Sequence, residues 1–276
     1  MRPLGPGARV GGADVIAHLA RSNVLDVYDA WDPERGCRVA VKTLRPDRRH
    51  DRRARAALLR EGRLLARLQH PHLVRAYAVH EGERPAVVLE TLRGATLAAL
   101  LSQRRLGVAE ASHLGLQLGA ALHFLHRRGL VHLDVKPSNV IAHAGAATLL
   151  DLSIARRPGR VRAGTGTWCF LSPEQARGGH AGPAADVWGL AALLHGALAG
   201  RAPFGDEDDD ELAEFPCLER RAAPLRSLRP ALPRALASAL DAGLAPDPAA
   251  RPALPALLQV LDEAAGRPAG PGRWTL

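Results

Sequence analysis

Lysine is nearly absent from this chain of 276 residues. Of its 37 basic residues only Lys42 and Lys136 are lysine, and all the others are arginine. A lysine ammonium is a compact point charge on a flexible stem, whereas the guanidinium group is a broad planar fork. The two are therefore not interchangeable where a single charge must reach a phosphate. The surroundings of the two lysines are the most informative parts of the sequence.

Cysteine and aromatic residues are also scarce. The 3 cysteines, Cys37, Cys169 and Cys217, are odd in number and far apart, which gives neither a disulfide framework nor zinc-ligand spacing and fits a reducing cytoplasm. Aromatic residues make up 4% of the chain, and the arginines behind the net charge of +9 are spread along its whole length. Solvated surfaces explain this charge better than nucleic-acid binding does, so we expect no nucleic-acid partner.

Long hydrophobic runs are missing. The longest apolar stretch, 189–200, is interrupted by His195 and is too short to span a bilayer. Residues 1–12 are rich in glycine and proline rather than apolar, unlike a secretory signal. We therefore expect no membrane segment in this chain and a cytoplasmic location.

Hydrophobic periodicity changes along the chain, which is long enough for one domain with two lobes. Residues 1–14 are expected to be a disordered lead. Strands and one helix follow, and from about residue 95 the pattern is mainly helical, with a buried helix marked by Leu114, Leu118, Leu122 and Leu125. The predicted strands are 24–31, 37–44, 73–79 and 86–90, with a short hairpin at 140–150, and the predicted helices include 51–68, 184–198, 232–242 and 252–264.

Glu61 stands out within the predicted helix 51–68. It comes three residues after Leu58 and four before Leu65, on the apolar face of the helix. A carboxylate in that position must find a positive partner or lose its charge. The alternative is an exposed glutamate on a frayed helix.

Four motifs surround the two lysines and their neighbours. Val39-Ala40-Val41-Lys42 ends a strand, His132-Leu133-Asp134 is followed by Lys136 and Asn139, and Asp151-Leu152-Ser153 and Ser172-Pro173-Glu174 come later. In this order and spacing they resemble the signature of a eukaryotic-like, bacterial-type serine/threonine protein kinase domain. The resemblance extends from about residue 15 to about residue 265.

The resemblance implies an α+β, two-lobed fold. A small antiparallel β-sheet lobe with one helix would occupy residues 15–92 and a larger helical lobe residues 93–265, with a nucleotide cleft between them and a flexible tail at 266–276. It also implies that Glu174 and Arg251 form a buried pair bracing the activation segment, and that Gly166-Thr167 seats the substrate residue.

Site residues follow from the same resemblance. Lys42 would hold the α- and β-phosphates of ATP and pair with Glu61, Asp134 would be the catalytic base, and Lys136 would neutralise charge on the transferring phosphoryl group. Asn139 and Asp151 offer the hard oxygen ligands that Mg²⁺ prefers. The other residues assigned to nucleotide binding are Val27, Ala40, Glu90 and Leu92, the last two through backbone groups. ATP and Mg²⁺ are the implied cofactors, and Lys136-Pro137 points to Ser/Thr hydroxyls of proteins as substrates.

Five positions depart from the family pattern. The glycines of the glycine-rich loop would fall at Ala20, Ser22 and Leu25, and all are missing. Leu133 replaces the arginine that usually pairs with an activation-loop phosphate, which makes activation by that switch doubtful. Ser153 replaces a glycine, and a left-handed backbone there would cost about 1–2 kcal/mol.

Competing functions remain open. The favoured hypothesis is an active kinase, because every charged group needed for the chemistry is present. The alternative is a pseudokinase, a scaffold or allosteric partner with weak or no nucleotide turnover, motivated by the lost glycines and Ser153. A small-molecule phosphotransferase is disfavoured by Lys136, the Ser172-Pro173-Glu174 motif and Arg251. For the acidic run at 206–211 two predictions remain, a solvated loop or a binding site for a basic partner.

Overall fold

The structure, a computed structural model, describes residues 2–205 and 214–266. Contacts divide the chain into two units, residues 1–93 with 151–153, and residues 94–150 with 154–276. The acidic run at 206–211 and nearly all of the predicted tail lie outside the described residues. Along the described ranges, no helix combines the length and apolar character needed to cross a membrane.

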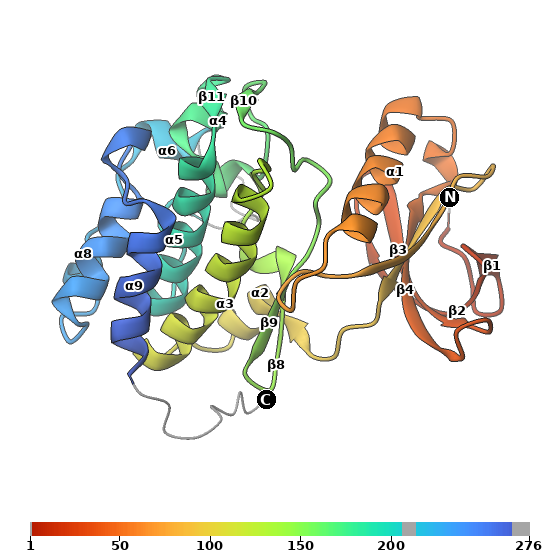
Figure 1. Cartoon of the computed structure of the whole chain (residues 1–276), viewed down its shortest axis with the longest axis horizontal. Helices are drawn as coiled ribbons and strands as arrows, with labels where there is room; N and C mark the ends of the chain where they lie inside the picture. The colour runs from red at the N-terminus through yellow and green to blue at the C-terminus, as the bar shows by residue number, and fades with distance from the viewer. Residues whose placement is uncertain (1, 206–213, 267–276) are drawn as a thin grey trace. The chain divides into compact units, whose positions relative to one another are not determined.

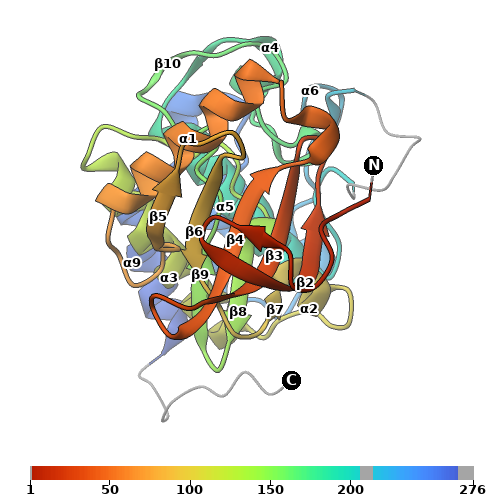
Figure 2. The same ribbon diagram turned by 90° about the vertical axis from the view of Figure 1, so that its right-hand side faces the viewer.

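An antiparallel sheet forms most of the first unit. Its strand order is β1-β2-β3-β4-β6-β5 (Figure 2). Its elements are β1 (Arg9–Val10), β2 (Ala13–Arg21), β3 (Leu25–Asp32), β4 (Cys37–Leu44), a short 3-10 turn (Pro46–Arg48), α1 (Arg52–Arg67), β5 (Ala76–His80) and β6 (Ala86–Glu90). The predicted strands at 24–31, 37–44 and 86–90 correspond to β3, β4 and β6.

The N-terminal segment differs from expectation, since it is ordered rather than a disordered lead. Val10 in β1 is buried in the same apolar cluster as Tyr28 and Val41, and the Leu4 N–H donates a hydrogen bond to Tyr28 Oη at 3.0 Å. Gly11 has φ +59°, and a Cβ there would lie 3.1 Å from Ala86 Cβ. Glycine thus suits both the left-handed backbone at this position and the close approach of the chain to the sheet. The few apolar residues of the N-terminal segment thus cover a face of the sheet that would otherwise be exposed to solvent.

Helix α1 packs beside β4, β5 and β6. Asp51 caps its N-terminus by accepting hydrogen bonds from the Arg53 and Ala54 N–H groups. Leu58 and Leu65 are buried on its inner face together with Glu61. The apolar stripe in the sequence therefore predicted both the helix and its buried face.

The second unit is mainly helical. Its long helices α3, α5 and α9 pack side by side (Figure 1), and the four leucines that marked the buried helix are all fully buried in α3. The helices are α2 (Leu97–Leu101), α3 (Val108–His126), α4 (Pro173–Arg177), α5 (Pro183–Ala199), α6 (Pro216–Glu219), α7 (Leu225–Leu228), α8 (Arg234–Gly243) and α9 (Leu254–Ala265). Short 3-10 turns lie at Pro137–Asn139, Trp168–Phe170 and Pro248–Ala250.

Short strands complete the second unit. β7 (Ala95–Thr96), β8 (Val140–His143) and β9 (Ala146–Leu149) form one sheet, and β10 (Gly159–Arg160) pairs with β11 (His180–Ala181). The β8–β9 hairpin is the one expected at 140–150. It directly follows the segment that carries Asp134, Lys136 and Asn139.

Candidate active site

Lys42 lies at the centre of a charged cluster in the first unit. Its Nζ donates hydrogen bonds to both carboxylate oxygens of Glu61, each at 2.9 Å, and to Asp151 Oδ2 at 3.0 Å. The Lys42 side chain is 10% exposed and that of Glu61 2%. The buried glutamate therefore has the positive partner that its place on the apolar face required.

Two carboxylates share this one ammonium group, and their pKa values move apart. Burial raises the pKa of Glu61 to about 7, because the attraction of Lys42 offsets the lost hydration only in part and the charge of Asp151 opposes ionisation. Burial acts the same way on Asp151, but Lys42 and hydrogen bonds from Ser153 outweigh it and hold the pKa of Asp151 well below its ordinary value. Asp151 is thus the charged carboxylate of the pair. Although burial opposes it, the two acidic neighbours raise the pKa of Lys42.

The segment 151–153 bends at Asp151, not at Ser153. Asp151 has φ +56°, whereas Ser153 is not among the residues with a left-handed backbone. The condition for strain at Ser153, a left-handed backbone, is therefore not met, and the left-handed residue lies two positions earlier. The Ser153 N–H donates to Asp151 Oδ1 at 2.9 Å, and the Ser153 carbonyl accepts a hydrogen bond from the Arg60 guanidinium on α1. These contacts tie the triplet to the helix that carries Glu61.

Three of the residues expected to contact the nucleotide base, Val27, Ala40 and Glu90, lie on the same sheet as Lys42. Val27 is the register partner of Lys42, and Ala40 lies two residues before Lys42, so the three side chains share one face of the sheet. Val27 and Ala40 are half-buried. Leu92 lies just beyond the end of β6, and it is also half-buried.

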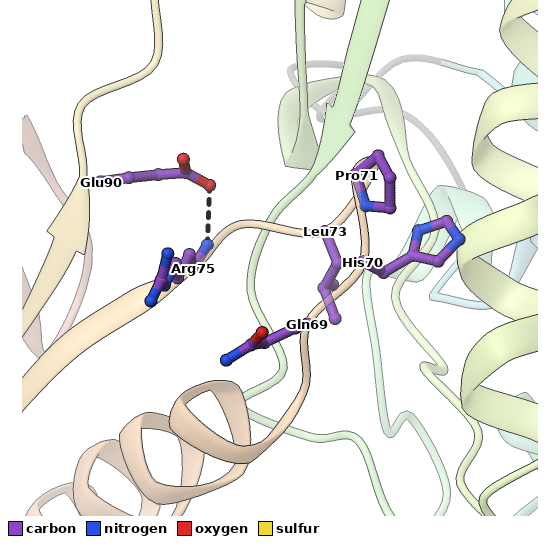
Figure 3. Close-up of a pocket in the computed structure, with 6 residues that line it drawn as sticks. All are labelled: Gln69, His70, Pro71, Leu73, Arg75 and Glu90. Atoms are coloured by element: carbon purple, nitrogen blue, oxygen red, sulfur yellow. Dashed lines mark hydrogen bonds between the residues drawn. The ribbon is translucent and has the colours of Figure 1, made fainter.

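Glu90, at the end of β6, borders a pocket of about 330 Å³ in the first unit. Its carboxylate points at Arg75 and accepts the Arg75 N–H at 2.8 Å (Figure 3), while the Glu90 N–H donates to the Arg75 carbonyl at 3.0 Å. These contacts leave the carbonyl of Glu90 as the backbone group that could contact a nucleotide base. The pocket is lined by Gln69, His70, Pro71, Leu73, Arg75 and Glu90.

Asp134 is the centre of a second group of site residues, in the second unit. Its Oδ2 accepts a hydrogen bond from Asn139 Nδ2 at 2.8 Å, and its Oδ1 accepts one from Thr167 Oγ1 at 2.7 Å. The Asp134 N–H donates to Nδ1 of the buried His132 at 3.2 Å. The carboxylate is therefore fixed in orientation while it stays partly exposed, and Lys136 is half-buried two residues further on.

Asp186 supports this loop from α5, a role that sequence reasoning missed. Its carboxylate accepts the N–H groups of His132 at 2.9 Å and Leu133 at 2.7 Å, and His126 Nε2 donates to it at 2.7 Å. Asp186 has no exposed surface, so its charge is balanced by these donors. An acidic residue at the start of an otherwise apolar helix was the signal that could have identified it.

Leu133 adopts a left-handed backbone, with φ +68°. Its side chain is buried in an apolar cluster with Val131, Val161, Ala181 and Ala185. The position where the family usually has arginine thus holds part of the activation segment by apolar contact rather than by charge.

The brace expected between Glu174 and Arg251 is present. Arg251 Nη1 and Nη2 donate to the two carboxylate oxygens of Glu174, each at 2.7 Å, and the Arg251 side chain has no exposed surface. Nearby, Gln175 Nε2 donates to the carbonyls of Leu133 and Thr165, each at 2.8 Å. Both ends of the segment 165–174 are therefore held by buried polar contacts.

Comparison with known families gives a match to the protein kinase domain over residues 17–260. The chain belongs to the protein kinase domain family. A probable serine/threonine-protein kinase of Streptomyces coelicolor is 34% identical over 231 residues, covering 78% of this chain and 34% of that protein. PknD of Mycobacterium tuberculosis is 32% identical over 254 residues, covering 89% of this chain and 38% of PknD.

Solved structures give the same family. The crystal structure of the M. tuberculosis PknI kinase domain matches with a TM-score of 0.77 and 26% identity, covering 96% of this chain and 100% of that domain. The predicted fold class, an antiparallel sheet lobe with one helix and a larger helical lobe, is thus confirmed. This kinase domain spans about a third of the length of the curated relatives named above.

Proposed function

We propose that this kinase domain transfers the γ-phosphoryl group of ATP to serine or threonine hydroxyls of proteins. The observation that carries the proposal is the Asp134 carboxylate, which is partly exposed and held on both oxygens by Asn139 and Thr167. A carboxylate fixed in this way can orient an alcohol and accept its proton. The serine/threonine kinases among its relatives support the same class of substrate.

Each charged residue has a place in this reaction. Lys42, held by Glu61, would contact the α- and β-phosphates. Asp134 would take the proton of the substrate hydroxyl. The hydroxyl oxygen of the substrate would bond to the γ-phosphorus while the bond between the γ-phosphorus and the β,γ-bridging oxygen breaks, which releases ADP. Lys136 would balance negative charge on the phosphoryl group in transfer. Val27, Ala40, Glu90 and Leu92 would hold the adenine end.

The residues present fit Mg²⁺. The low pKa of Asp151 keeps its carboxylate charged, as suits a metal ligand. Asn139 donates hydrogen bonds to Asp134 through its amide nitrogen, which leaves its amide oxygen to serve as a metal ligand. When bound, Mg²⁺ would neutralise charge on the β- and γ-phosphates. Asn139 and Asp151 are the residues that would hold it.

Two substitutions separate binding from transfer. Asp134→Asn should lower the transfer of labelled phosphate from Mg-ATP to a general protein substrate by roughly 10²–10⁴-fold, with Mg-ATP affinity unchanged. Lys42→Arg keeps the charge but loses the compact ammonium, and should weaken Mg-ATP binding itself. Melting temperatures of both variants control for folding.

Three outcomes decide between the hypotheses. Equal label incorporation by the wild type and Asp134→Asn would contradict the kinase proposal. Mg-ATP binding by the wild type without any transfer would identify a pseudokinase. Phosphorylation of small alcohols but of no protein would indicate a small-molecule phosphotransferase. The cytoplasmic location and the absence of a nucleic-acid partner stay predictions.

A further inference from the structure

The hairpin between β2 and β3 lies where this family usually has its glycine-rich, phosphate-covering loop. Here the turn is Ser22-Asn23-Val24-Leu25, without glycine. None of these four residues has a left-handed backbone. The turn is closed by a hydrogen bond from the Ser22 N–H to the Leu25 carbonyl at 2.8 Å.

Ser22 satisfies the N–H groups at the tip of this hairpin. Its Oγ accepts the Leu25 N–H at 3.0 Å and the Val24 N–H at 3.4 Å. Backbone N–H groups in such a turn are natural donors to phosphate oxygens. In this chain the Ser22 hydroxyl already occupies two of them.

Arg45, one residue after β4, holds the carbonyl groups of the same tip. Its Nη1 donates to the Ser22 carbonyl at 3.2 Å and to the Asn23 carbonyl at 3.4 Å, and its backbone N–H donates to the Val24 carbonyl at 2.9 Å. Asp47 fixes the guanidinium with two hydrogen bonds of 3.0 Å. The Val24 and Leu25 N–H groups and the carbonyl groups of Ser22, Asn23 and Val24 therefore all have hydrogen-bond partners within the first unit.

We propose that Ser22, in a hairpin that Arg45 holds closed, withholds the Val24 and Leu25 N–H groups from the phosphates of a bound nucleotide. Ser22 is then a positioning residue that lowers nucleotide affinity, and Lys42 is left as the chain's main direct contact to the phosphates. This inference rests on the proposed function, because it assumes that the first unit binds ATP.

The substitution Ser22→Ala tests it, with Ser22→Thr as the matched control. Alanine removes the competing hydroxyl, whereas threonine keeps it, and the side chain is exposed, so neither change should unfold the protein. Calorimetric titration with Mg-ATP, ADP and adenosine measures affinity. Ser22→Ala should bind Mg-ATP and ADP about 3- to 10-fold more tightly, the gain expected from freeing one or two hydrogen-bond donors. Adenosine, which has no phosphates, should bind unchanged.

Kinetics and amide exchange give independent readouts. KM for ATP should fall in Ser22→Ala, with no matching rise in kcat, and the Val24 and Leu25 amides should exchange faster in the nucleotide-free protein. Ser22→Thr should match the wild type in all of these.

Equal or weaker ADP binding by Ser22→Ala would overturn the inference and leave the kinase proposal standing. An equal gain for adenosine would also overturn it, because the phosphates would then not be the group sensed. Absence of nucleotide binding in every variant would overturn both.

Discussion

At the scale of single residues, the scarcity of lysine sets the ammonium group of Lys42 apart from the guanidinium groups around it. Lys42 is buried between two carboxylates, whereas Arg45 of the same unit contacts both a carboxylate, that of Asp47, and the backbone carbonyls of the hairpin tip. The planar guanidinium suits such multiple contacts. The lysine ammonium and the arginine guanidinium groups therefore have different structural roles within the first unit.

The raised pKa of Glu61 predicts how stability depends on pH. Its ordinary value is 4.5, and in the folded protein it is about 7, so the folded state binds more protons between these values. The stability linked to Glu61 is thus present below pH 4.5 and lost as the pH rises through 7. Glu61→Gln lacks this titration, so the melting temperature of the wild type minus that of Glu61→Gln should fall over this window. A difference that stays constant across this window would mean that Glu61 is already ionised in the folded protein.

At the scale of elements, the close packing of α1 against the sheet depends on Gly62. A Cβ at this position would lie 2.5 Å from one methyl group of Val87 and 2.9 Å from one of Val79. Both neighbours are β-branched and cannot turn away freely. The glycine next to Glu61 therefore permits the close approach that brings Glu61 to Lys42.

Gly62→Ala should consequently lower both stability and activity. Alanine usually favours a helix by up to about 1 kcal/mol over glycine, but overpacking here should outweigh this and cost about 1–3 kcal/mol in unfolding free energy. Denaturant unfolding and phosphate transfer are the measurements. Gly82→Ala, where a Cβ meets nothing within 4 Å, is the control. A more stable, fully active Gly62→Ala would show that α1 can move away without loss.

The success of sequence-based prediction differed among elements for physical reasons. Helix α1 was found because its buried residues follow the helical period, and strand β4 because an apolar run with β-branched residues follows a turn. The N-terminal segment was missed because it covers the sheet with isolated apolar residues, which leave no period. The support that Asp186 gives to the loop was missed because its partners are backbone N–H groups distant in sequence. The left-handed backbone of Asp151 was not predicted, since the replacement of a glycine at Ser153 does not reveal which dihedral angle the fold requires.

At the scale of the whole molecule, the activation segment is held in place without a phosphate. Leu133 packs against Val161 and Ala181, Gln175 ties the Leu133 and Thr165 carbonyls together, and Glu174 is paired with Arg251. A phosphate would need a cation where this chain has the buried Leu133. Apolar contacts, neutral hydrogen bonds and one permanent ion pair therefore hold the segment without the usual charge switch.

Activity should accordingly be independent of phosphorylation in this segment. Thr165, whose hydroxyl donates to the Arg162 carbonyl at 2.7 Å, does not contact Asp134, and unlike Ser172 it is not fully buried. Phosphatase treatment of the wild type, and separately Thr165→Ala, should each leave kcat/KM within about twofold, because one exposed hydrogen bond is worth about 0.5 kcal/mol or little more. Mass spectrometry should confirm that the treated protein carries no phosphate. The prediction would be contradicted if kcat/KM fell tenfold or more in both samples and incubation with Mg-ATP restored it only in the phosphatase-treated wild type. A phosphate on Thr165 would then bind a cation other than the missing arginine.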